Sequence, residues 1–272
     1  MWPAEAGERT LAPVVRTAPS SLEVEQCSPS KWANVTFYRH GTRFHPVVLY
    51  SPALGLLMSD VWRGSKELPL NVVDIAVGFV NSMNGSFETE AGRQAVVLSM
   101  LRNLLPLCSV DCVTVDSRRT DGTVTRMPGG RRLCNVEVKK EVASHGDPGL
   151  QNVGYVAAFY HECRDQRSAG VVPMAAVTVT GNLLAFSGSV LVDGHLVVEP
   201  LTDHVFTRCT HDSYKVVAQM LLALQKSVEA LYEVGGCLAV IVLGPGPPPP
   251  YPLAGMSSVK SVGRVGTPRS WR

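Results

Sequence analysis

The sequence has no Cys-x-x-Cys pair, although it contains 7 cysteines among its 272 residues. The cysteines are odd in number and scattered along the chain, so neither a structural zinc site nor a disulfide framework is expected. Several lie in apolar runs, as Cys134 and Cys237 do, where a free thiol behaves as a small hydrophobic side chain. This usage of cysteine predicts a reducing compartment, and hence an intracellular protein.

Long apolar runs are also missing. No stretch reaches the roughly eighteen continuous apolar residues that are needed to span a bilayer. The first residues, Met1 to Glu5, do not form a basic segment followed by an apolar run, which is the pattern of a secretory signal. We therefore expect neither a signal peptide nor a transmembrane segment, and no membrane partner.

A strong charge of one sign is absent as well. The net charge is +2, which does not by itself indicate a polyanionic partner. Basic residues are concentrated between Val115 and Glu141, a segment that contains seven basic and four acidic residues. For any one arginine in this segment, the simplest interpretation is a solvated hairpin tip.

Composition divides the chain into three parts. Residues 1–33 are polar and interrupted by prolines, and are predicted to be a loosely ordered lead-in. Residues 34–243 form the predicted domain, which is large enough to bury a substantial core. Residues 244–272 are rich in proline, glycine and serine, and are predicted to be a tail.

The front of the domain, residues 50–106, is predicted to be helical. Ser51-Pro52 is a hydroxyl cap followed by a proline in the first turn, which marks a helix start. Apolar residues at helical spacing predict two more helices, from Asn71 to Gly85 and from Glu88 to Leu105.

From residue 110 onward, in the part predicted to carry the sheet and the site (110–243), apolar residues recur with a period closer to two. A helix is expected to start at Asp147-Pro148, and a long helix to span Asp212 to Val234. The predicted strands are Cys112–Val115, a hairpin that holds Asp121 and Glu137, Met174–Thr180, Leu183–Val192, His195–Val198 and Cys237–Leu243. The fold class is therefore α/β (α+β), with a central mixed sheet flanked by helices.

The segment from Asn135 to Glu141 contains the candidate site. In a strand, Glu137 and Lys139 point to one side while Val136 and Val138 point to the other. The glycine pair at 129–130 predicts a turn, which would bring Asp121 beside Glu137.

This combination suits a hard cation beside a phosphate. Magnesium, or manganese in its place, prefers oxygen ligands, which Asp121 and Glu137 would supply. Lys139 would complete the electrostatic stabilisation of the reacting phosphate. A lysine that is partly desolvated beside a metal is expected to have a lowered pKa, which suits proton transfer.

The alternative interpretation is that Glu137 and Lys139 are ordinary exposed residues on a half-buried strand, because Glu-x-Lys is common by chance. The following helix favours a site. Gln151 and Tyr155 are four residues apart and share a helix face, so both are predicted to point toward the strand end that holds Lys139.

These residues resemble a family. Asp121-Gly122, Glu137-x-Lys139 and Gln151-x-x-x-Tyr155 are similar to the PD-(D/E)xK pattern of restriction-endonuclease-like nucleases, in the branch with a Gln-x-x-x-Tyr motif. More closely, residues 46 to 235 resemble the nuclease-like module that precedes a protein-kinase domain in Crinkler-type and fungal-kinase-associated proteins. The runs that carry this second resemblance are Tyr50–Ala53, Glu90–Arg93, Glu137–Glu141, Gly146–Pro148, Gln151–Tyr155 and Pro200–Asp203.

The resemblance implies metal-dependent hydrolysis of nucleic acid in an intracellular protein that could act in a nucleus. DNA is the favoured substrate, and the choice between DNA and RNA stays open. It implies that Asp121 and Glu137 bind magnesium or manganese with help from Glu90, that Lys139 is catalytic, and that Gln151 and Tyr155 support the site. Lys140 replaces the asparagine that usually follows the catalytic lysine, and is taken as a further supporting residue. A protein-kinase domain is implied as a partner in longer relatives, and the oligomeric state stays open.

Two other functions remain open. The same fold would serve as a nucleic-acid-binding or kinase-associated regulatory module whose catalytic site has decayed, because a fold does not fix a function. Separately, Arg39-His40-Gly41-Thr42-Arg43 resembles the phosphate-binding loop of histidine phosphatases, with His211-Asp212 as the distal pair. That pattern departs from the phosphatases at His45, which stands where they have a proline.

Overall fold

The computed structural model describes eight stretches of the chain, all within the unit Met1–Val240. These are residues 35–37, 45–64, 67–115, 118–127, 130–141, 147–162, 172–192 and 195–234. The predicted lead-in at 1–33, the predicted strand Cys237–Leu243 and the predicted tail at 244–272 lie outside these residues.

The front of the domain is helical, and two of its helices begin at side-chain caps. The helices are α3 (Val47–Tyr50), α4 (Pro52–Arg63), α5 (Leu70–Met83) and α6 (Glu90–Leu104). The hydroxyl of Ser51 accepts a hydrogen bond from the backbone N–H of Leu54 at 3.4 Å, as the Ser51-Pro52 signal predicts. The hydroxyl of Thr89 accepts from Gly92 N at 3.2 Å and starts α6.

The central sheet is mixed, as predicted. Its strands are β1 (Val35–Phe37), β2 (Cys108–Asp111), β5 (Gly122–Arg126), β6 (Arg132–Lys139), β7 (Val172–Thr180), β8 (Leu183–Val192), β9 (His195–Pro200) and β10 (Val205–Phe206). They are ordered β1-β9-β8-β7-β6-β5-β2, with β10 paired to β8. The β6–β7 and β1–β9 pairs are parallel, and the others are antiparallel.

The predicted strand Cys112–Val115 is wrong in its position. The chain leaves the central sheet after Asp111, where β2 ends. It then forms a separate two-stranded sheet from β3 (Thr114–Val115) and β4 (Arg118–Arg119). Thr120 holds this change of direction, because its backbone N–H donates to the Val113 carbonyl at 2.9 Å.

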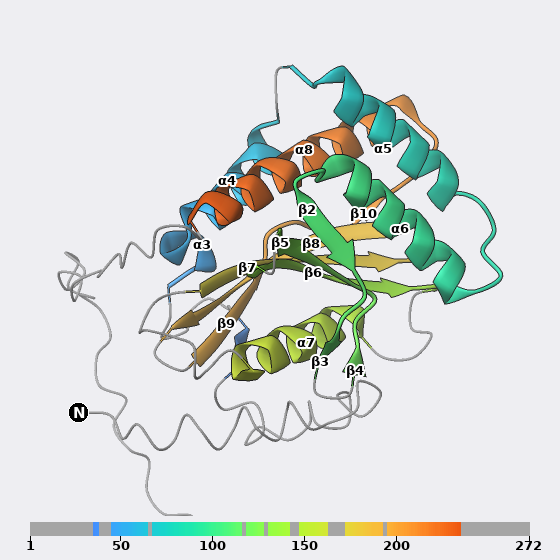
Figure 1. Cartoon of the computed structure of the whole chain (residues 1–272). Helices are drawn as coiled ribbons and strands as arrows, with labels where there is room; N and C mark the ends of the chain where they lie inside the picture. The colour runs from blue at the N-terminus through green and yellow to red at the C-terminus, as the bar shows by residue number, and fades with distance from the viewer. Residues whose placement is uncertain are drawn as a thin grey trace, which may run out of the picture. The chain divides into compact units, whose positions relative to one another are not determined.

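Helices cover both faces of the central sheet (Figure 1). Helices α4, α5, α6 and α8 (His211–Val234) lie on one face, and α7 (Pro148–Glu162) lies on the other. The larger core contains Val136 and Val138 together with apolar residues of α4, α5, α6 and α8. The smaller core packs α7 against β9 and β3. The valines of β6 therefore face the larger core, as predicted, which leaves Glu137 and Lys139 on the other side of the strand.

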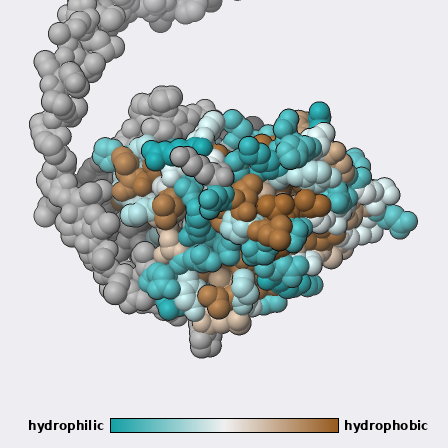
Figure 2. Space-filling model, turned by 90° about the horizontal axis from the view of Figure 1, so that it is seen from above, coloured by the Kyte–Doolittle hydropathy of each residue, from teal (hydrophilic) through white to brown (hydrophobic). Residues whose placement is uncertain are grey.

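The outer surface of the larger helical layer carries apolar side chains between polar ones (Figure 2). Leu56, Trp62 and Leu70 are exposed there, on α4 and α5. Within the described stretches, no helix combines the length and the apolar character that crossing a membrane requires.

Candidate functional site

The pairing of β5 with β6 brings the two predicted carboxylates together. Gly122 lies opposite Val136 in this antiparallel pair, so continuing the register by one residue places Asp121 opposite Glu137. Side chains directly opposite each other in an antiparallel pair point to the same face. The predicted juxtaposition of Asp121 and Glu137 is therefore observed.

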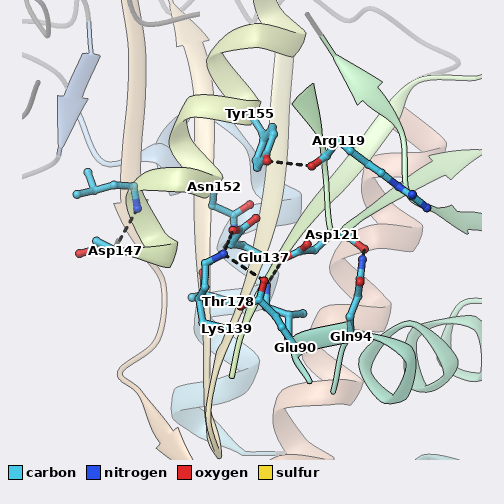
Figure 3. Close-up of polar contacts among 12 residues, drawn as sticks. Glu90, Gln94, Arg119, Asp121, Glu137, Lys139, Asp147, Asn152, Tyr155 and Thr178 are labelled. Atoms are coloured by element: carbon cyan, nitrogen blue, oxygen red, sulfur yellow. Dashed lines mark hydrogen bonds and ion pairs between the residues drawn. The ribbon is translucent and has the colours of Figure 1, made fainter. Parts of the chain in front are cut away.

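Four charged side chains meet at this point (Figure 3). Asp121 Oδ2 accepts a hydrogen bond from the backbone N–H of Val138 at 2.8 Å. Lys139 Nζ lies 3.1 Å from Glu137 Oε1 and 3.5 Å from Glu90 Oε1. Two carboxylates come from the hairpin and one from α6, and a single ammonium group lies between Glu137 and Glu90.

The site is closed on the side of the sheet and open on the side of α6. The side chains of Glu137, Lys139 and Glu90 are 3%, 12% and 43% exposed. Glu137 is therefore not a surface residue on a half-buried strand, and a buried carboxylate is costly unless it is paired. Its Oε1 is paired with Lys139, but its buried Oε2 has no hydrogen-bond partner among the described residues.

Crowding of these groups raises the pKa of both hairpin carboxylates. Burial, followed by the nearby charge of Asp121, raises the pKa of Glu137 to about 8, against a partial opposing effect of Lys139. Burial also raises the pKa of Asp121, although the Val138 hydrogen bond and the Lys139 charge oppose this change. Two acids that resist ionisation side by side form an environment that favours a bound cation.

The carboxylates around Lys139 raise its pKa, whereas the predicted lowering concerns a lysine beside a bound metal ion. Burial lowers it, but the carboxylates of Glu137, Glu90 and Asp121 more than offset that effect, so the Lys139 pKa lies above its ordinary value. The surrounding carboxylates therefore favour the protonated form of Lys139.

A buried polar network holds the middle of the site, and the sequence did not single it out. Asn152 on α7 accepts from Asn135 Nδ2 at 2.6 Å and donates to Thr178 Oγ1 at 3.1 Å. Asn152 Nδ2 also donates to the Val177 carbonyl at 3.0 Å. Thr123 Oγ1 in turn donates to Asn135 Oδ1 at 3.3 Å. This network joins α7 to β5, β6 and β7 directly beside Glu137.

We expect replacement of Asn152 by alanine to lower the free energy of unfolding by about 2–4 kcal/mol, because buried partners lose their hydrogen bonds. Urea unfolding measures this loss. Asn103→Ala, at an exposed amide on α6, is the matched control and is expected to change stability by no more than about 0.5 kcal/mol. Equal small effects for both variants would show that the network contributes little.

The remaining predicted residues lie around this centre. The Tyr155 hydroxyl donates to the Arg119 carbonyl at 2.9 Å, two residues before Asp121, and so ties α7 to β4 (Figure 3). Gln151 is buried in the first turn of α7. Lys140 is partly exposed just after β6, and no ion pair joins it to the three carboxylates in the described part of the chain.

Asp121 and Glu137 are the two carboxylates that could hold a magnesium or manganese ion. Across the stretches that the structure describes, no three or more His, Cys, Asp or Glu side chains form a group suited to a metal ion. Magnesium, however, commonly takes one or two protein carboxylates and keeps several waters. The unpartnered Oε2 of Glu137 is the observation that supports such a ligand role, with Asp121 opposite.

The predicted phosphatase site falls mostly on residues that the structure does not describe. Its loop, which contains Arg39 and His40, lies outside the described residues, and His211 is the exposed first residue of α8.

No protein-family model, no curated protein and no solved structure matches this chain.

Proposed function

We propose that this protein hydrolyses phosphodiester bonds of nucleic acid with a divalent metal ion, at a PD-(D/E)xK-type site in a restriction-endonuclease-like fold. One observation carries the proposal. Glu137 is buried directly opposite Asp121, and one of its oxygens has no hydrogen-bond partner in the described part of the chain. The ammonium group of Lys139 lies 3.1 Å from its other oxygen.

Each residue has a role that its position supports. Asp121 and Glu137 would hold magnesium or manganese, which supplies an activated water and neutralises charge on the phosphate. Lys139 stays protonated and stabilises negative charge that develops on the phosphate. Glu90 is the most exposed of the three carboxylates and stands at the open side of the site, where a further ligand or a bound water would be held.

One exposed arginine near the site supports a substrate that carries phosphate groups. Arg119 is exposed and lies two residues before Asp121, where a guanidinium group would contact a neighbouring phosphate. The resemblance favours DNA over RNA, an intracellular and nuclear protein, and a protein-kinase domain in longer relatives. These remain parts of the proposal.

Incubation of the purified protein with supercoiled plasmid tests the proposal. We expect nicked and linear products with magnesium or manganese, and none when EDTA removes the metal. A plasmid that stays intact in both metals, but whose mobility is retarded by the protein, would contradict nuclease activity and favour the binding module. Cleavage that persists in EDTA would contradict the metal-dependent mechanism.

A further inference from the structure

We propose that Gln94 is a positioning residue for Asp121, and that α6 sets the spacing of the two carboxylates. This inference rests on the proposed function only for its catalytic consequence. Asp121 immediately precedes β5 and is not a residue of the strand itself.

On the β2 side, the carbonyl of Asp121 is bonded by side chains instead of by a strand. The last paired residues of β2 and β5 are Asp111 and Thr123, so the ladder stops just before it would reach Asp121. The Asp121 carbonyl accepts from Gln94 Nε2 at 2.6 Å and from the Cys112 thiol at 3.2 Å. Gln94 therefore takes the place of a missing strand at the residue that carries a proposed metal ligand.

Helix α6 also packs directly against Gly122, the residue that follows Asp121. A Cβ atom added to Gly122 would lie 2.5 Å from Leu98 Cδ2, so Leu98 would have to move to make room for it. Leu98 lies one turn after Gln94, so one face of α6 both packs on Gly122 and binds Asp121. Glycine at position 122 thus permits the close approach that lets Gln94 reach the carbonyl.

The same helix holds the other side of the site. Arg93 Nη1 donates to the Gly181 carbonyl, and Gly181 N donates to the Lys139 carbonyl at 2.9 Å. Glu90 contacts the Lys139 ammonium group. The first two turns of α6 therefore contact both Asp121 and the end of β6, and the distance between the carboxylates depends on how this helix docks.

Hydrogen exchange of the Val138 amide tests the inference without any need for activity. Asp121 Oδ2 accepts from this amide, so a displaced Asp121 leaves it unprotected. Gln94→Met keeps the length of the side chain and removes the donor. We expect exchange at Val138 to rise about 10-fold or more by NMR, while amides in the centre of β7 stay unchanged.

Two further variants complete the experiment. Asn103→Met, at the exposed far end of α6, is the matched control and is expected to leave Val138 exchange unchanged. Gln94→Asn keeps the amide but shortens its reach, so it is also expected to raise exchange at Val138. This variant replaces Gln94→Met in the experiment if Gln94→Met does not fold. Unchanged exchange at Val138 in a folded Gln94 variant would overturn the inference.

A second readout separates positioning from stability. If the wild-type protein cleaves DNA, the Gln94→Met variant is expected to bind manganese about 10-fold more weakly and to have a lower kcat, with KM for DNA unchanged. A wild-type protein that does not cleave would refute the proposed function but not the Val138 result. Faster exchange without any change in manganese affinity or kcat would refute the catalytic consequence alone.

Discussion

Replacing Glu137 by glutamine is expected to lower the rate of metal-dependent cleavage by about 10³-fold or more. The substitution keeps the shape of the side chain but removes the charge that binds the metal ion. Loss of one ligand weakens both the binding of the ion and its effect on the phosphate, which together are worth several kcal/mol. Each 1.36 kcal/mol of lost transition-state stabilisation costs a factor of about ten in rate.

Initial rates of plasmid nicking at saturating magnesium measure this effect. Glu199→Gln is the matched control, because Glu199 is a partly buried carboxylate whose Oε2 accepts from Val47 N at 2.8 Å, at the start of α3. We expect its rate to stay within about twofold of wild type. Cleavage by Glu137→Gln at a rate close to wild type would remove Glu137 from the catalytic site.

The same Glu137→Gln substitution is expected to stabilise the metal-free protein at high pH. Burial and the charge of Asp121 raise the pKa of Glu137 from 4.5 to about 8. Between these values the folded protein retains a proton that the unfolded chain releases, so the free energy of unfolding falls as pH rises. This contribution is fully present below pH 4.5 and is lost as pH rises through 8. Glutamine cannot ionise, so the variant is expected to be more stable by about 2–4 kcal/mol at pH 9 and nearly unchanged at pH 5.

Urea unfolding at pH 5 and pH 9 in EDTA tests this expectation. Asp60→Asn is the control, because Asp60 forms an ion pair with Lys226 at 2.8 Å whose two side chains are 30% and 45% exposed. Such pairs contribute about 0–1 kcal/mol.

Magnesium should stabilise the wild-type protein at pH 9 but not Glu137→Gln, because only the wild type binds the ion. A loss of stability in Glu137→Gln at pH 9 would instead identify Glu137 and Lys139 as a structural ion pair.

Local signals in the sequence predicted most of the fold. Ser51-Pro52 and Asp147-Pro148 marked helix starts, and α4 and α7 begin at these points. The Asp147 side chain accepts from Leu150 N at 3.1 Å, as a cap does. The alternation in Asn135–Glu141 predicted which side chains of β6 face the larger core. These signals act over a few residues, so the sequence alone carries them.

Features that depend on distant contacts were not predicted. The exit of the chain from the sheet after Asp111 depends on Thr120 bonding back to Val113, which no propensity signals. The burial of Glu137 depends on α7 covering its strand. The pKa of Lys139 is raised first by Glu137 and then by Glu90, which comes from another helix. Asn135, Asn152 and Thr178 lie on three different elements, and only the packing of α7 on β6 and β7 brings them together.

Crystals soaked in manganese test the central claim most directly. Anomalous diffraction should show a manganese ion bound by Asp121 and by the Glu137 oxygen that has no partner here, with Lys139 no longer the sole cation at the site. The claim would be contradicted if manganese were absent from this position at concentrations that saturate divalent metal sites, with Lys139 still paired to Glu137.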